Sequence, residues 1–386
     1  MIQFLDLKKI NEPYEIAFQE KLNAVLEKGW YILGNEVSVF ENNFANYCDA
    51  KYCIGVGNGF DALVLIFKAY IQLGKLRKGD EVIVPANTYI ASILAIVEAD
   101  LVPVLVEPKL ETYNIDPDLI TVKISSKTKA ILAVHLYGQL AEMDAINEVA
   151  KANNLLVVED AAQSHGAKFS VQCSESSVQS SFPETQNTQI ATPNLVAAYS
   201  FYPGKNLGAL GDGGAVVTND SELAKTIRIL RNYGSEIKYH IEYIGVNSRL
   251  DELQAAFLNV KLPNLDQENS IRKAIANRYL TEIKNDKIIL PNVSLRETKQ
   301  SNNHVFHLFV IRTKNRNELQ QFLLDKGIQT MIHYPIPPHQ QKAFENWNNL
   351  SFPVTEKIHN EVLSLPISPV LTDDEVSFVI EILNQY

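Results

Sequence analysis

A lysine in a glycine-rich turn is the first residue of this chain whose surroundings suggest chemistry. Lys205 lies in residues 200–208 (SFYPGKNLG), and five glycines occur between positions 204 and 214. Glycines let the backbone bend tightly and approach a ligand closely. A lysine in a turn is ordinarily a solvated surface residue, but one desolvated in such a pocket can act as an amine nucleophile and proton carrier. Ser200 offers a hydroxyl to a phosphate, whereas Asn206 excludes a Walker A loop.

A carboxylate directly after an apolar run is the second candidate. Asp160 belongs to residues 159–166 (EDAAQSHG), which follow the apolar residues 155–158. This position predicts a strand end, where open α/β sheets bind ligands. Asp160 is then either the N-cap of a following helix or a partner that keeps a proton on the nitrogen of an aromatic cofactor ring. Gln163 lies three positions further on.

Two further turns follow predicted strands. Residues 57–63 (GNGFDAL) predict a strand, a glycine turn and a helix, so the backbone at Asn58, Gly59 and Phe60 offers free N–H groups to an anion. Tyr89 follows the apolar residues 81–85 and has a ring that can stack on a flat cofactor. The ordinary alternative for residues 57–63 is a tight turn without a ligand. For Tyr89 it is an exposed loop tyrosine.

Residues 245–256 (GVNSRLDELQAA) predict the start of a helix with Asn247 or Ser248 as its N-cap. Side chains at Asn247 and Arg249 are then placed to reach a neighbouring phosphate. Taken alone, the segment predicts only a well-capped helix.

The elements that carry these turns have the pattern of an α/β protein. Continuous apolar runs at 81–85, 102–106, 130–134 and 155–158 are separated by helical patterns. Such runs predict a mostly parallel sheet covered on both faces. A strand at 305–311 and a helix at 316–326 predict a smaller C-terminal α/β domain. We expect a large domain at 1–260, with N-terminal helices and a polar insertion at about 170–194, and a small domain at 261–386.

Composition narrows the class of function. The net charge is −10 and basic residues form no run, which argues against nucleic acid or an anionic membrane as the main partner. Three cysteines without a Cys-x-x-Cys pair indicate neither a metal site nor a disulfide framework. No apolar stretch approaches the roughly 20 residues of a membrane span. We therefore expect a soluble, cytoplasmic protein without a metal.

Together the segments resemble the DegT/DnrJ/EryC1/StrS sugar aminotransferases, which are fold type I enzymes dependent on pyridoxal 5′-phosphate (PLP). The resemblance covers nearly the whole chain, and its most specific parts are EDAAQSHG and the run from Ser200 to Gly214. It implies that Lys205 holds PLP covalently and moves the proton, while Asp160 pairs with the ring nitrogen. The other implied cofactor contacts are Gln163 at the ring hydroxyl, Tyr89 on the ring face, Asn58, Gly59, Phe60 and Ser200 at the phosphate, and Asn247 at the phosphate from a second subunit. A homodimer with a shared active site is thereby implied.

Residues 29–34 (GWYILG) and 4–7 (FLDL) are similar to enzymes that act on dTDP-linked 3-keto-6-deoxyhexoses. That similarity implies glutamate as amino donor and a dTDP-3-amino-3,6-dideoxyhexose as product, used in surface polysaccharide or a glycosylated metabolite. Substrate contacts are expected at Tyr31, His333, Tyr334 and His339. The alternatives are a UDP-4-keto sugar as substrate, or a non-catalytic PLP-binding regulatory protein. A related dehydratase is disfavoured because it has histidine in place of Lys205.

Overall fold

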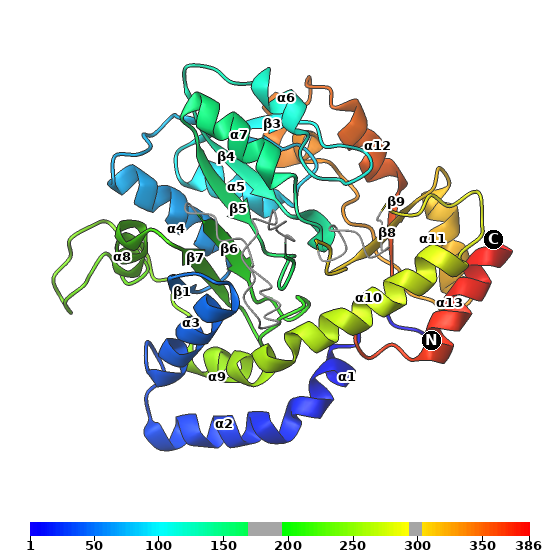
Figure 1. Cartoon of the computed structure of the whole chain (residues 1–386), viewed down its shortest axis with the longest axis horizontal. Helices are drawn as coiled ribbons and strands as arrows, with labels where there is room; N and C mark the ends of the chain where they lie inside the picture. Colours follow the sequence, from blue (N-terminus) through cyan, green and yellow to red (C-terminus); the bar gives the residue numbers. More distant parts are fainter. Residues whose placement is uncertain (169–194, 293–302) are drawn as a thin grey trace, which may run out of the picture.

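A seven-stranded sheet forms the centre of the larger part of the molecule (Figure 1). The computed structural model describes residues 1–168, 195–292 and 303–386, so the polar insertion predicted at about 170–194 lies outside the described residues. Neighbouring strands are parallel except β7, which is antiparallel to β1 and β6. The predicted mostly parallel α/β fold is confirmed. In spatial order the strands are β1 (Tyr52–Val56), β7 (Gly214–Thr218), β6 (Val196–Ser200), β5 (Leu156–Asp160), β4 (Thr128–Val134), β2 (Glu81–Pro85) and β3 (Val102–Val106).

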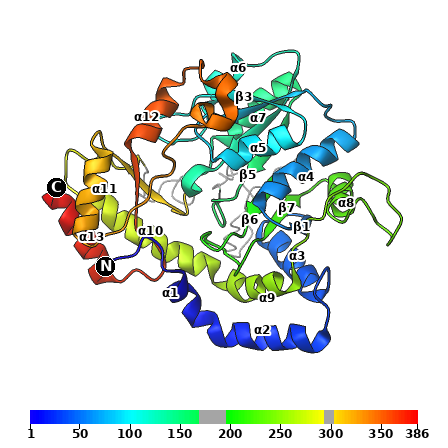
Figure 2. The same cartoon turned by 180° about the vertical axis from the view of Figure 1, so that it is seen from behind.

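Both faces of this sheet are buried, which explains the continuous apolar runs. In β2, Val82 and Val84 pack into one core, while Ile83 packs into another on the opposite face. The first face is covered by α4 (Gly59–Gln72), α5 (Ile90–Glu98) and α8 (Ser221–Leu230). The opposite face is covered by α3 (Asn35–Tyr47), α9 (Glu252–Lys261), α6 (Pro117–Thr121) and α7 (Met143–Asn153), and Figure 2 shows this arrangement from behind.

The C-terminal part has a core of its own, built on an antiparallel pair of strands. Helix α10 (Leu265–Glu282) runs diagonally from the large sheet to this second core (Figure 1). Ile2 joins the second core and pairs in parallel with Ile328, so both ends of the described chain lie beside it. The remaining elements are α1 (Leu7–Asn11) and α2 (Glu15–Lys28) at the start, then β8 (Phe309–Arg312), α11 (Arg316–Asp325), α12 (Pro353–Glu361), β9 (Val362–Leu365) and α13 (Asp373–Gln385).

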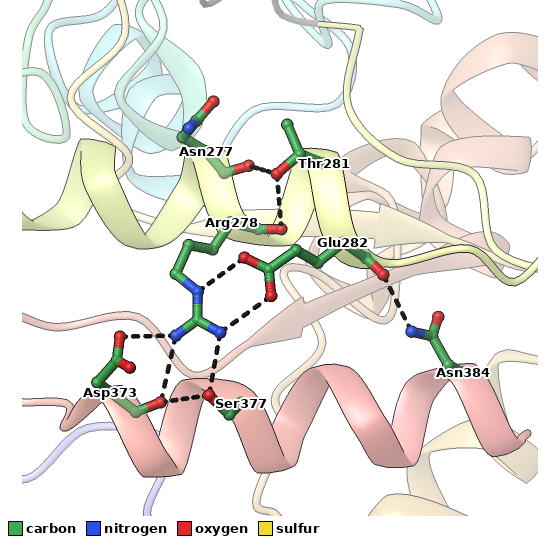
Figure 3. A network of polar contacts seen from close by, with 7 residues as sticks. All are labelled: Asn277, Arg278, Thr281, Glu282, Asp373, Ser377 and Asn384. Atoms are coloured by element: carbon green, nitrogen blue, oxygen red, sulfur yellow. Dashed lines mark hydrogen bonds and ion pairs between the residues drawn. The ribbon is translucent and has the colours of Figure 1, made fainter.

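A polar network fastens α10 to α13 at the surface (Figure 3). Arg278 donates to both oxygens of Glu282 on its own helix, to Asp373 over 2.7 Å and to the Ser377 hydroxyl over 3.0 Å. Because these side chains are largely exposed, the network aligns the helices but contributes little net stability. The core beneath it carries most of the energy of this contact.

The predicted helix start at Asn247 or Ser248 is wrong. Helix α9 begins at Glu252, with Asp251 in the N-cap position. The residues before it are extended: Asn247 forms a bridge with Asn232, and Asp251 forms one with Ile32. Backbone groups that would start a helix at 248 are used in these pairings, which explains the difference.

Across the described residues, no helix is both long and apolar enough to cross a membrane.

Candidate active site

Lys205 and Asp160 lie at the carboxyl ends of neighbouring strands. Asp160 is the last residue of β5, and Ser200 ends β6 just before the turn that carries the lysine. Burial lowers the pKa of the Lys205 amine to about 8, and the negative charge of Asp160 opposes that shift. An amine with this pKa is partly unprotonated near neutral pH and can act as a nucleophile or proton acceptor.

The turn around Lys205 depends on glycine. A Cβ atom at Gly208 would lie 2.3 Å from the carbonyl oxygen of Pro203, a contact that no side chain permits. The backbone N–H of Lys205 donates to the Tyr202 carbonyl over 2.8 Å. The glycine-rich sequence therefore folds into a compact loop that holds the lysine close to the sheet edge.

Three histidines lie near Lys205: His165 is fully buried, and His307 and His333 are partly buried. Of these, only His333 is a candidate from the sequence. Burial first, and the charge of Lys205 second, lower the pKa of His165 to about 3 and that of His333 to about 4. The same two causes hold the pKa of His307 well below its usual value. All three rings are therefore neutral at pH 7 and add no positive charge beside the amine. His307 also binds the Asn206 side chain over 3.1 Å.

Gln163 is held in one orientation. Its Oε1 accepts from the backbone N–H of Tyr137 over 2.6 Å, and its Nε2 donates to the Tyr334 hydroxyl over 3.1 Å. Nε2 has a second hydrogen, so the amide can donate to a further partner. The Tyr334 ring lies 5.1 Å from the Tyr89 ring, so the structure brings together three of the residues named from the sequence.

A close approach of two turns forms the candidate phosphate cradle. A Cβ at Gly59 would lie 2.5 Å from Ser200 Cβ, so the start of α4 meets the end of β6 only because residue 59 is glycine. Asn58 caps α4 and accepts from the Asp61 backbone N–H over 2.8 Å. The Asp61 carboxylate accepts from the Ser248 hydroxyl over 2.6 Å. Gly59 and Phe60 are the first two residues of α4, and the N-terminal N–H groups of a helix favour an anion.

Two of the predicted contacts, Asn247 and Tyr31, have exposed side chains. Asn247 is exposed beside its bridge to Asn232, and its neighbour Arg249 donates to the Asn232 side chain over 2.9 Å. Tyr31 is 49% exposed on the turn before α3. An exposed Asn247 is available to a second subunit, which is what the sequence analysis expects of it.

His339 is placed differently from the other substrate candidates. It is fully buried, its Nε2 lies 3.2 Å from Glu356 Oε1, and its ring packs edge-on against Phe352. These contacts are those of a histidine that packs the loop against α12. The geometry therefore does not support His339 as a substrate contact.

Taken together, the residues fit a phosphorylated pyridine cofactor. The amine, the carboxylate, the amide donor and an anion-binding helix start converge on one edge of the sheet. Ser92, which the sequence analysis did not single out, donates to Asp160 over 2.7 Å. Its single polar atom within an apolar helix gave no sequence signal. Among the described residues, no group of three or more His, Cys, Asp or Glu side chains is arranged to hold a metal.

The comparisons with known proteins agree with this geometry. Residues 14–384 match the model of the DegT/DnrJ/EryC1/StrS aminotransferase family. A dTDP-3-amino-3,6-dideoxy-alpha-D-galactopyranose transaminase of Aneurinibacillus thermoaerophilus is 54% identical over 386 residues, which cover 100% of this chain and 99% of that protein.

Two solved structures are similar over the whole chain. DesV of S. venezuelae, in complex with a ketimine intermediate, has a TM-score of 0.90 and 43% identity, covering 100% of this chain and 98% of that one. NtdA from Bacillus subtilis, with bound cofactor PMP, has a TM-score of 0.86 and 32% identity, covering 100% of this chain and 84% of that one. The predicted PLP cofactor, the aminotransferase class and the fold are thereby confirmed. The chain belongs to the DegT/DnrJ/EryC1/StrS aminotransferase family.

Proposed function

We propose that this enzyme transfers the amino group of glutamate to the 3-keto carbon of a dTDP-linked 6-deoxyhexose, giving the 3-amino-3,6-dideoxy sugar. The carrying observation is the buried amine of Lys205, with its pKa of about 8, held beside the Asp160 carboxylate. The sugar class is supported by the relative that is 54% identical, whose name gives a dTDP-3-amino-3,6-dideoxy sugar.

Lys205 and Asp160 have complementary roles in this proposal. PLP, when bound, supplies an electron sink for the carbon that loses its proton. Lys205 would hold the cofactor covalently, and its amine would also move the proton. Asp160 faces the ring nitrogen and keeps it protonated, because an opposite charge nearby favours the charged form of a base.

In this proposal, the neighbouring side chains orient the cofactor. Gln163 presents an amide N–H to the ring hydroxyl, and Tyr89 covers the ring face. The start of α4 would hold the phosphate, through the backbone of Asn58, Gly59 and Phe60 and the Ser200 hydroxyl. Since Asp61 is already bonded to Ser248, this contact depends on backbone N–H groups more than on the Asp61 side chain.

A homodimer completes the site in this proposal. Asn247, exposed on its own subunit, reaches the phosphate bound by the other. Tyr31, His333 and Tyr334 bind the sugar nucleotide. His333 and Tyr334 lie close to the cofactor residues, because Tyr334 contacts both Gln163 and Tyr89.

The test is direct amination by the purified protein. It is incubated with PLP, glutamate and either a dTDP-3-keto-6-deoxyhexose or a UDP-4-keto sugar, and product mass is followed. Amination of the dTDP sugar alone supports the proposal, while amination of the UDP sugar alone overturns the sugar class. PLP binding without any amination favours a regulatory, non-catalytic protein.

Two variants test the residue roles. Lys205→Ala should abolish turnover with the circular dichroism spectrum unchanged, and normal activity in this variant would end the assignment. Asp160→Asn should still bind PLP but lose most of its activity, because a neutral amide no longer holds the ring proton. Full activity of Asp160→Asn would remove Asp160 from that role.

A further inference from the structure

A short chain of hydrogen bonds lies behind Asp160. The Ser92 hydroxyl donates to Asp160 Oδ2 over 2.7 Å, and Ser92 Oγ lies 2.9 Å from Thr88 Oγ1. Ser92 is fully buried, and Thr88 and Asp160 are 2% and 8% exposed. Water therefore competes little for these bonds, and each is stronger than it would be at the surface.

The donors and acceptors in this chain can be assigned. A hydroxyl has one hydrogen, and an ionised carboxylate only accepts. The Ser92 hydrogen is used on Asp160, so Ser92 Oγ must accept from Thr88. The second Asp160 oxygen, Oδ1, accepts from the backbone N–H of Ala162 over 3.1 Å. The chain thus runs in one direction, from Thr88 through Ser92 to the carboxylate.

The chain joins two sides of the cofactor site. Thr88 directly precedes Tyr89, the residue proposed to cover the ring face, and Ser92 lies in the first turn of α5. Asp160 ends β5, 68 positions further along the sequence. The same hydroxyls therefore fix the turn on the ring face and the carboxylate at the ring nitrogen.

We propose that Ser92, with Thr88 behind it, is a positioning residue that holds the Asp160 carboxylate in the orientation that pairs with the cofactor ring nitrogen, and so favours a protonated ring. This inference rests on the proposed function. The Ser92 hydroxyl fixes Oδ2 and the Ala162 N–H fixes Oδ1, so the carboxylate has one orientation. A carboxylate aligned with the ring nitrogen favours the protonated form of that nitrogen. Without the Ser92 hydroxyl the carboxylate can turn away, and the less protonated ring is a weaker electron sink.

The test reads the ring proton without turnover. The enzyme is reconstituted with PLP labelled with 15N in the ring, and the 15N chemical shift distinguishes protonated from unprotonated nitrogen. Wild type should show the protonated signal. In Ser92→Ala the signal should move toward the unprotonated position, and kcat should fall roughly ten- to a hundredfold, the range for a hydrogen bond to a charged group. KM for glutamate should stay within about twofold, because binding contacts are retained.

Two more variants guard against a folding artefact. Ser92→Thr keeps the hydroxyl and should retain the protonated signal, while Thr88→Val removes the donor to Ser92 and should give a smaller shift. Thr128→Val is the matched control. Its buried hydroxyl also donates to a carboxylate, that of Glu81 over 3.1 Å, but at the amino ends of β2 and β4, and its signal should match wild type.

The outcomes separate this inference from the proposed function. An unchanged 15N signal and kcat in Ser92→Ala, with active wild type, would overturn the role of Ser92 and leave the aminotransferase proposal intact. An equal shift in Thr128→Val would also overturn it. A wild-type enzyme that binds no PLP, or holds it with an unprotonated ring, would remove the role of Asp160 and this inference together.

Discussion

The carboxylate of Glu252 replaces a missing helix cap, and the variant Glu252→Gln tests how much it contributes. Helix α3 begins after Gly34, which has no side chain to cap it. Glu252 Oε1 accepts from the backbone N–H groups of Gly34 over 2.6 Å and Val37 over 3.1 Å, and Oε2 accepts from that of Glu36 over 2.9 Å. These N–H groups have no partner within the helix, and a negative charge there also favours the helix dipole.

The expected cost follows from these three bonds. Glutamine has one acceptor oxygen in place of two, so one N–H loses its partner and faces an amide donor. The other two bonds become neutral, and each loses about 1 kcal/mol. An unsatisfied buried donor costs about 1–3 kcal/mol. Because Glu252 is only 3% exposed, water cannot replace the lost acceptor, and the total is about 3–5 kcal/mol.

Amide hydrogen exchange followed by mass spectrometry measures this change where it occurs. Peptides covering residues 34–40 should exchange roughly a hundred- to a few-thousandfold faster in Glu252→Gln, since about 1.4 kcal/mol is a factor of ten. Glu375→Gln is the matched control: Glu375 also caps a helix, but partly exposed on α13, and its loss should cost under about 1 kcal/mol. Unchanged exchange at 34–40 in Glu252→Gln would refute the reasoning.

The same measurement has a functional side, because the Glu252 backbone N–H donates to the Tyr31 carbonyl over 3.1 Å. The turn that carries Tyr31 is therefore held by both the backbone and the side chain of one residue. If Tyr31 binds the sugar nucleotide, Glu252→Gln should raise KM for that substrate more than it lowers kcat. An unchanged KM together with faster amide exchange would show that Tyr31 does not contribute to substrate binding.

The remaining predictions concern the amine, the phosphate cradle and a buried ion pair. Since the pKa of Lys205 is about 8 and only the unprotonated amine reacts, PLP uptake by apoenzyme should accelerate up to about pH 8 and then level off in stopped-flow absorbance. A rise continuing past pH 10 would contradict this. Gly59→Ala would place Cβ 2.5 Å from Ser200 Cβ and should weaken PLP binding roughly tenfold or more in a fluorescence titration. An unchanged affinity would show that the phosphate is not bound at the start of α4. Glu41 accepts from Arg231 over 2.6 Å with both side chains buried or nearly so, so Glu41→Gln should lower the free energy of unfolding by about 3 kcal/mol in urea. A loss below about 1 kcal/mol would show that the pair is not effectively buried.

The central sheet could be predicted from the sequence because its strands are buried on both faces. Apolar runs such as 81–85 and 130–134 became β2 and β4 with nearly the expected limits. The antiparallel direction of β7 could not be predicted, since burial dictates which residues are apolar but not which way the strand runs. The N-cap of α9 is Asp251, three or four residues after the predicted Ser248 or Asn247. All three are capping residue types, but the fold uses Asn247 in a bridge and Ser248 in a bond to Asp61.

In the candidate site, too, local sequence patterns reveal some residues and not others. Lys205 and Asp160 stand out locally, one by its glycines and the other by its place after an apolar run. Ser92 and His307 have ordinary local surroundings, a serine in an apolar helix and a histidine before a strand. Their significance depends on contacts with Asp160 and Asn206, 68 and 101 positions away. Local patterns therefore predict the reacting groups better than the residues that position them.

The position of Tyr334 shows why the two cores must act together. Gln163 lies in the turn after strand β5 of the large sheet, whereas Tyr334 follows the segment that pairs with the C-terminal strand β9 through Met331 and Ser364. The two parts are joined at the site by Gln163 Nε2, which donates to Tyr334, and by the Tyr137 hydroxyl, which donates to the His333 carbonyl. Because Tyr137 also fixes Gln163 through its backbone N–H, a shift of the C-terminal part would disturb the amide that faces the ring hydroxyl. Substrate contacts made by His333 and Tyr334 are thereby coupled to how the cofactor is held.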